Sequence, residues 1–180
     1  MRLLIRNEIE QITPCDSLEA AHRADALAWI DSGVEIFRLV KPNTPPKHLC
    51  AYFAPVDQMK ILLGLHRTSG LWMPAGGHVE SGENPRDTVR REALEELSLV
   101  AKFVIERPLF ITLVDTVGLM EGHTDVDLWY AIEGIGSELP KFDEREFVDM
   151  RWHDFDQLPV RNVEPHLSRF VAKLRSCLCG

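Results

Sequence analysis

The segment that decides the fold is AGGHVESGENPRDTVRREALEELSL, residues 75–99. It opens with two adjacent glycines, whose lack of a Cβ lets the backbone approach another group closely. Asn84 followed by Pro85 is typical of a helix start, because the amide side chain caps free N–H groups and proline loses no hydrogen bond there. The segment therefore predicts a glycine turn followed by a helix that runs to about Leu97.

Three carboxylates share one face of this predicted helix. Glu92, Glu95 and Glu96 have the spacing i, i+3 and i+4, which places them within an arc of roughly 100°. Arg91 is able to pair with Glu95, but one guanidinium cannot neutralise all three carboxylates. Hard oxygen ligands without a nearby cysteine favour Mg²⁺ or Mn²⁺ over zinc, and Mg²⁺ commonly takes phosphate oxygens as further ligands. The pattern indicates metal-assisted phosphate chemistry, although glutamates on a helix often form only a solvated face.

The segment from Gly77 to Leu99 resembles the Nudix box. It has a glycine, five residues, Glu83, seven residues and then REALEELSL, so six of the seven fixed residues of the box are present. Ala93 stands where a larger aliphatic residue is usual. Ser98 replaces the final glycine, and if that position is left-handed the serine costs about 1 to 2 kcal/mol.

The resemblance implies a Nudix-type α/β/α sandwich around a mixed sheet, and a Mg²⁺-dependent hydrolase of diphosphate bonds in which Mn²⁺ is a possible substitute. It implies that the metal ligands are Glu92, Glu95, Glu96 and the Gly76 carbonyl. The catalytic groups would be Glu92, Glu95, Glu96 and Glu146. Glu92 would be either a metal ligand or the base that activates the attacking water. Gly77, Glu83 and Arg91 would support the loop and helix. For Glu146, an exposed loop charge is an equally good interpretation.

The sequence indicates the residues that contact the substrate less clearly than it indicates the metal ligands. His78, Trp72 and Asn162 are candidates, although a helix cap explains Asn162 without a ligand and aromatic residues such as Trp72 more often fill a core. Trp129 and Tyr130 are expected in the core for the same reason. His66, His78 and His123 are possible hydrogen-bond donors to phosphates, and no zinc-type spacing links them.

The nature of the substrate follows only by exclusion within the family. The chain has no proline between Pro108 and Pro140, where ADP-ribose-cleaving relatives carry one, and no tyrosine there besides Tyr130 to suit the dinucleoside-polyphosphate branch. Signature segments of the NADH and coenzyme A branches are also missing. A small substrate such as a nucleoside triphosphate or a modified nucleotide remains. The alternatives are a 5′-end RNA pyrophosphohydrolase and a non-catalytic nucleotide-sensing module.

Outside the box, the pattern predicts a helical extension with a Pro-rich connector in residues 1–45 and a Nudix domain in residues 46–180. In the extension, Asp16 is the predicted cap of a helix to Ile30, with Glu19 as its capping-box partner and Gly33 after its end. Its predicted buried stripe consists of Leu18, Ala21, Leu27 and Ile30. Predicted strands are 49–55, 60–66, 103–105, 109–114, 126–132 and 147–152. A last helix after Asn162 presents Leu167, Phe170, Val171, Leu174 and Leu178 to the core.

Composition limits the remaining possibilities. The chain has 180 residues, 45% of them hydrophobic and 27% charged, which is typical of one globular domain with or without a small appendage. No apolar run reaches the roughly 18 residues of a membrane helix, so a cytoplasmic location is expected. A formal charge of −8 argues against an extended nucleic-acid surface. The four cysteines are expected to be free thiols, and the sequence does not determine the oligomeric state.

Overall fold

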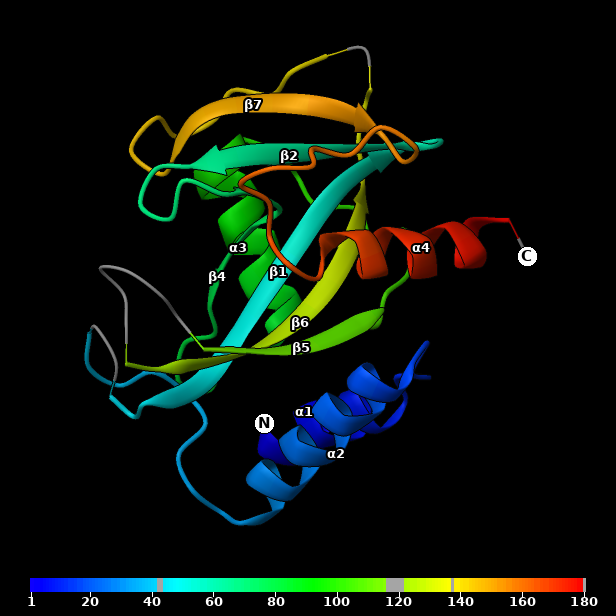
Figure 1. Ribbon diagram of the computed structural model, residues 1–180. Helices are drawn as coiled ribbons and strands as arrows, with labels where there is room; N and C mark the ends of the chain where they lie inside the picture. The colour runs from blue at the N-terminus through cyan, green and yellow to red at the C-terminus, as the bar shows by residue number, and fades with distance from the viewer. Residues whose placement is uncertain (42–43, 116–121, 137, 180) are drawn as a thin grey trace.

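A computed structural model describes residues 1–41, 44–115, 122–136 and 138–179. The chain forms four helices and seven strands within these residues (Figure 1). The helices are α1 (Arg2–Glu10), α2 (Ser17–Asp31), α3 (Pro85–Leu97) and α4 (Leu167–Leu178). The strands are β1 (Lys47–Asp57), β2 (Lys60–His66), β3 (Trp72–Met73), β4 (Ala75–His78), β5 (Phe110–Asp115), β6 (Thr124–Glu133) and β7 (Phe147–Asp154).

The strands make one mixed sheet in the order β3-β2-β1-β6-β5, with β4 paired to β1 and β7 paired to β2. The pairing of β1 with β6 is parallel, whereas the other ladders are antiparallel. Side chains alternate between the two faces of each strand. In β1, for example, Ala51 and Phe53 join one buried cluster, while Ala54 and Val56 join another.

Helices cover both faces of this sheet, as expected for an α/β/α sandwich (Figure 1). The first cluster contains Val89, Ala93 and Leu97 of α3 together with residues of α1 and α2. The second contains Leu167, Phe170, Val171 and Leu174 of α4, which pack near the buried Trp129. The predicted fold class and the core positions of Trp129 and Tyr130 are therefore confirmed.

The N-terminal region has two helices where one was predicted. In α2 the predicted cap is present, because Asp16 accepts a hydrogen bond from Glu19 N, while the Glu19 carboxylate accepts one from Cys15 N, one residue before the cap. The helix ends at Asp31, just ahead of Gly33, which has a φ of 80°. Helix α1 packs beside α2 through Ile5 and Ile9, both fully buried. These N-terminal helices share the core of the sheet.

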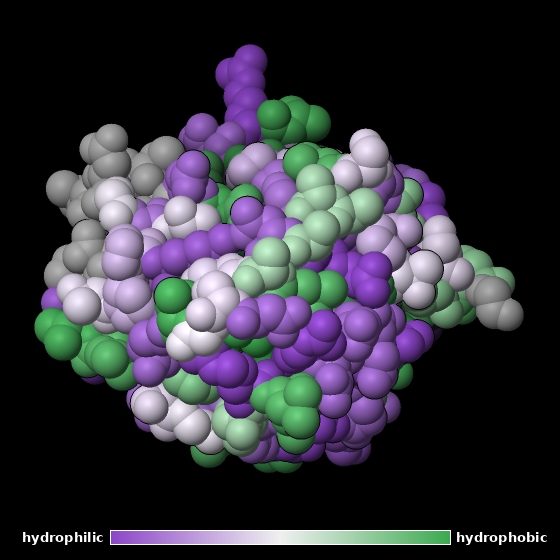
Figure 2. Space-filling view, turned by 90° about the horizontal axis from the view of Figure 1, so that it is seen from below, coloured by the Kyte–Doolittle hydropathy of each residue, from purple (hydrophilic) through white to green (hydrophobic). Residues whose placement is uncertain are grey.

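The surface over the N-terminal side is mixed in character. Figure 2 shows the molecule from below, where exposed hydrophobic residues lie in separate patches among hydrophilic ones. Leu3 of α1 and Leu18 of α2 are among the exposed hydrophobic side chains of the protein. No helix of the described residues is long and apolar enough to cross a membrane.

Several local predictions are wrong. Leu18 and Ala21 of the predicted stripe are exposed, whereas Ile30 is buried and Leu27 packs partly buried against the core as predicted. Helix α2 also buries Glu19 and Ala26, which the prediction did not include. Leu178 is 39% exposed at the end of α4. Segment 103–105 is not a strand: β5 pairs with β6 only from Thr124 to Trp129, and beyond Trp129 Phe103 makes one isolated bridge, to Ile132.

Two further predictions concern the start of α4 and the Pro-rich connector. Asn162 does not cap α4, because His166 is the residue before the helix and Asn162 has a left-handed φ of 50°. Pro42 of the predicted connector lies outside the described residues. The other predicted strands correspond to β1, β2, β5, β6 and β7, and all four cysteines are free thiols.

Candidate active site

The two glycines of β4 allow close contacts in the sheet and with α3, Gly76 against β1 and Gly77 against Glu92 of α3. A Cβ on Gly76 would lie 2.4 Å from the Ala51 carbonyl oxygen, and a Cβ on Gly77 would lie 2.1 Å from Glu92 Oε1. Real Cβ atoms do not approach other atoms this closely. The absence of a side chain at Gly77 is therefore what lets the Glu92 carboxylate rest against β4.

Helix α3 begins and ends as its sequence predicts. Asn84 Oδ1 accepts a hydrogen bond from Arg86 N at 2.8 Å, and Pro85 occupies the first turn. At the other end Ser98 has φ 53° and ψ 30°, the left-handed conformation that the Nudix box normally gives to glycine. The serine is accommodated there at the energetic cost expected for a residue with a Cβ.

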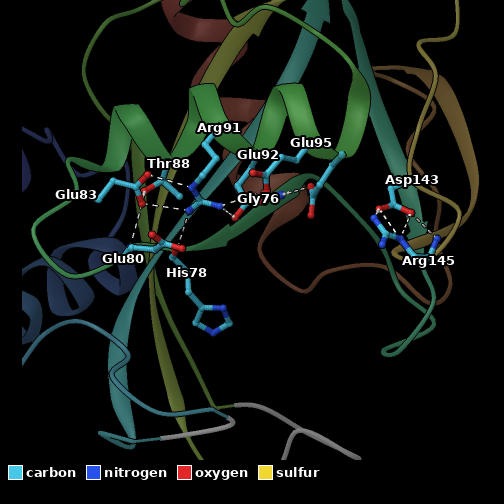
Figure 3. A network of polar contacts seen from close by, with 11 residues as sticks. Gly76, His78, Glu80, Glu83, Thr88, Arg91, Glu92, Glu95, Asp143 and Arg145 are labelled. Atoms are coloured by element: carbon cyan, nitrogen blue, oxygen red, sulfur yellow. Dashed lines mark hydrogen bonds and ion pairs between the residues drawn. The ribbon is translucent and has the colours of Figure 1, made fainter.

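An ion-pair network ties α3 to the loop before it (Figure 3). Arg91 Nε and Nη2 each lie 3.1 Å from an oxygen of Glu83, so the expected ion pair is present. The Thr88 hydroxyl and the Glu80 N–H both donate to Glu83 Oε2. Although burial acts to raise it, the hydrogen bonds from Arg91 lower the pKa of Glu83. Arg91 Nη2 also donates to the His78 carbonyl, which joins the helix to β4.

The three glutamates differ in environment. Arg91 Nη1 lies 2.6 Å from Glu92 Oε1 and 3.6 Å from Glu95 Oε2, and the Glu95 side chain is 61% exposed. Glu96 is buried and accepts a hydrogen bond from Gly76 N at 3.1 Å. Burial, followed by the charge of Glu92, raises the pKa of Glu96 to about 9. Burial also raises the pKa of Glu92, against the effect of Arg91.

The pKa of Glu96 is raised because its ionised form is buried next to another negative charge, without a cation among the described residues to compensate for it. Arg91 serves Glu83, Glu92 and Glu95, and the hydrogen bond that Glu96 accepts comes from an uncharged N–H. A divalent cation would supply the missing charge to hard oxygen donors of this kind. The residues present therefore fit Mg²⁺ or Mn²⁺.

These glutamates line a cavity of about 1100 Å³. Glu146 lines it as well, from the loop before β7, with its side chain 50% exposed and 3.8 Å from His66 Nε2. The charges of Glu146 and Asp143 contribute to the raised pKa of Glu96, after the larger effects of burial and Glu92. The loop is fixed to α3 because Asp143 N donates to the Glu96 carbonyl.

The candidate substrate-contact residues lie in different places. His78 lines the cavity, and burial together with the nearby Arg38 guanidinium lowers its pKa to about 3. Trp72 packs partly buried against the α4 side of the sheet, with Arg151 over its ring. The Asn162 carbonyl accepts a hydrogen bond from Trp72 N, so the two are held together. Their roles in substrate binding stay predictions.

The cavity also contains polar residues that the sequence did not single out. Glu164 lines it, and burial raises the pKa of that carboxyl to about 7. His48 and Asp125 lie side by side on β1 and β6 and form a cluster with His78 and His123. No sequence spacing signals this cluster, because the pairing of distant strands creates it.

Comparison with known proteins agrees with this geometry. The family model for the NUDIX domain matches residues 47–174, which is most of the chain. The chain is 29% identical over 126 residues to the uncharacterized Nudix hydrolase YvcI of Bacillus subtilis, covering 67% of this chain and 77% of that protein. It belongs to the Nudix family of hydrolases, enzymes that act on acid anhydrides of phosphorus.

Two further similarities bear on fold and substrate. The chain is 26% identical over 125 residues to the NAD-capped RNA hydrolase NudC of Erwinia tasmaniensis, covering 67% of this chain and 43% of that protein. A Nudix-family hydrolase of known structure from Clostridium perfringens matches with a TM-score of 0.56 and 21% identity, covering 71% of this chain and 97% of that one. This structural likeness shows the shared fold.

Proposed function

We propose that this chain hydrolyses a phosphoanhydride bond in a nucleotide-like substrate with the help of Mg²⁺, for which Mn²⁺ would substitute. One observation carries the proposal: the buried Glu96 carboxylate, which has no cationic partner among the described residues, lies beside Glu92 on a helix that lines a large cavity. The metal would be held by Glu92, Glu95, Glu96 and the Gly76 carbonyl, and when bound it would neutralise and polarise the diphosphate.

The other residues would act around this centre. Glu92 or Glu146 would accept the proton of the attacking water, and both line the cavity. Arg91 and Glu83 would hold α3 against the loop so that the glutamates keep their orientation, in keeping with their two-point ion pair. Gly77 would supply the space that the Glu92 carboxylate occupies.

The favoured substrate class is a nucleoside triphosphate or a modified nucleotide, because the sequence lacks the features typical of other branches of the family. A second candidate is the 5′ end of an RNA, since a relative with 26% identity is an NAD-capped RNA hydrolase. The formal charge of −8 argues against extended contact with RNA and favours the small substrate. Retention of Glu92, Glu95 and Glu96 argues against a purely sensing module.

Substitution of the metal-site glutamates tests the proposal. We expect Glu95→Gln and Glu96→Gln each to lower turnover by about 100-fold or more, as when an essential electrostatic group is removed. Glu133→Gln is the matched control, because Glu133 is an exposed residue at the end of β6. Turnover is measured by chromatography of the products with Mg²⁺, from a panel of free nucleotides, capped RNA and triphosphorylated RNA. Unchanged turnover in both site variants would contradict the proposed metal site.

A further inference from the structure

A cluster of three imidazoles and a carboxylate lies at the same cavity, which His78, His123 and Asp125 line, while His48 is fully buried. His48 on β1 is the register partner of Asp125 on β6, and His78 on β4 is the partner of Cys50, two residues further along β1. His123 comes directly before β6. The pairing of three strands thus brings together side chains that are far apart in the sequence.

The imidazole nitrogens converge on one oxygen atom. The Nε2 atoms of His48, His123 and His78 lie 3.1, 3.4 and 3.9 Å from Asp125 Oδ1. All four ligand atoms lie within 4.8 Å of one another. In a tetrahedral zinc site with bonds of about 2.1 Å, neighbouring ligand atoms are about 3.4 Å apart. Small shifts of these side chains would suffice to reach that geometry.

The environment of His48 indicates that a proton or a cation lies between His48 Nε2 and Asp125 Oδ1. The side chain is fully buried, and its Nδ1 lies 2.8 Å from the Pro45 carbonyl oxygen, which only accepts hydrogen bonds. Nδ1 therefore carries the proton, and in the neutral ring Nε2 turns a lone pair toward the Asp125 carboxylate. Two acceptors at 3.1 Å repel unless a proton or a metal ion lies between them. A metal-bound histidine typically binds the metal through one ring nitrogen and donates a hydrogen bond from the other to a carbonyl, as His48 Nδ1 does to Pro45.

We propose that His48, His78, His123 and Asp125 form a site for one transition-metal cation of the zinc class, separate from the glutamate site. Imidazole nitrogens suit zinc, cobalt, nickel and copper, whereas Mg²⁺ prefers an all-oxygen set. Four protein ligands close the coordination sphere, which is the pattern of a structural site. The cation would tie β1, β4 and β6 together at the cavity wall.

Arg38 opposes the cation. Its Nη1 lies 3.1 Å from His78 Nε2, so the guanidinium donates to the same lone pair that a metal would use. Arg38 is only partly buried and lines the cavity, so it has space to move aside. We expect Arg38→Gln to tighten metal binding by about tenfold or more, because it removes a positive charge beside the cation.

Cobalt is a suitable probe, because tetrahedral Co²⁺ absorbs strongly in visible light. The full chain is treated with a chelator, dialysed and titrated with Co²⁺ in millimolar Mg²⁺. We expect one Co²⁺ per chain with visible absorption bands, displaced by Zn²⁺ and not by Mg²⁺. His123→Asn and Asp125→Asn should lose the bands, whereas Glu96→Gln should keep them. His66→Asn is the matched control, because His66 lines the same cavity outside the cluster.

Absence of bound Co²⁺, displacement by Mg²⁺, or unchanged bands in His123→Asn and Asp125→Asn would overturn the proposal. Loss of the bands in Glu96→Gln would also overturn it, because the cation would then belong to the glutamate site. If the variants fail to fold, nitrogen NMR of the histidines in the wild-type protein tests the proposal without them. Zinc should shift the Nε2 signals of the three histidines, and a persistent imidazolium at His48 with zinc present would show that a proton fills the gap instead.

Discussion

The environment of Glu96 is at odds with the ordinary chemistry of a carboxyl group. Its carboxyl is buried beside the Glu92 charge, and both effects raise its pKa to about 9 from an ordinary value of 4.5. Between these pH values the folded, metal-free chain holds a proton that the unfolded chain has released. The free energy of unfolding of the metal-free protein therefore falls as pH rises from about 4.5 to about 9.

A divalent cation at Glu96 must displace this proton. We expect the affinity for Mn²⁺ to rise with pH by up to about tenfold per unit and to level off near pH 9. Calorimetric titrations in buffers of different ionisation enthalpy would count the protons released on binding. Glu96→Gln should reduce the pH dependence, leaving only the smaller part due to Glu92, and a flat affinity from pH 6 to pH 9 in the wild type would contradict the assignment.

Residues differ in how far their positions follow from the sequence. The contact of Arg91 with Glu95 was predictable because helix geometry makes residues i and i+4 neighbours. His48 and Asp125 were not predictable, because only the register between β1 and β6 makes them neighbours. The resemblance to the Nudix box could not identify Glu164, which lies far outside that segment.

At the scale of elements, the end of α3 departs most clearly from the family pattern. Ser98 has the left-handed conformation, which costs a residue with a Cβ about 1 to 2 kcal/mol. Ser98→Gly removes this strain but makes the unfolded chain more flexible, which offsets part of the gain. We expect a net stabilisation of about 0.5 to 1 kcal/mol by urea denaturation. Ser98→Ala is the control and should give no gain, and equal stabilisation by both variants would refute the strain.

The prediction of elements succeeded where local signals were strong. The cap at Asp16, the start at Asn84 and the predicted strands that correspond to β1, β2, β5, β6 and β7 were correct because each depends on neighbouring residues. Helix α1 was missed because Met1 offers no side-chain cap and the helix depends on burying Ile5 and Ile9 against the rest of the protein. The buried face of α2 was wrong because tertiary contacts turn Glu19 inward.

At the scale of the whole molecule, charged side chains join α2 to α4. Glu19 is fully buried and lies 2.5 Å from Lys173 Nζ, whose side chain is 9% exposed. Asp16, the cap of α2, pairs with Arg169 of α4 at 2.6 Å. Glu19 also accepts the Cys15 N–H, so its carboxylate serves both the start of α2 and the contact with α4.

Removal of one partner should leave a buried charge without compensation. We expect Lys173→Met to lower the free energy of unfolding by about 3 kcal/mol in urea denaturation. The double variant Glu19→Gln with Lys173→Met should lose less, because the buried group is then neutral and still accepts from Cys15 N. Arg6→Gln is the control, because its pair with Asp31 is solvent-exposed and should contribute less than about 1 kcal/mol. A double variant as unstable as Lys173→Met would contradict this account.

The parallel ladder between β1 and β6 has a consequence for how the two halves of the cavity assemble. The contacts of β4 and α3 with β1 join segments that follow one another along the chain, whereas β6 pairs with β1 only after the whole intervening chain has looped back. Closing the longer loop costs more entropy and slows the step. During refolding we therefore expect Glu92, Glu95 and Glu96 of α3 to reach their places beside β4 before β6 brings Asp125 to His48.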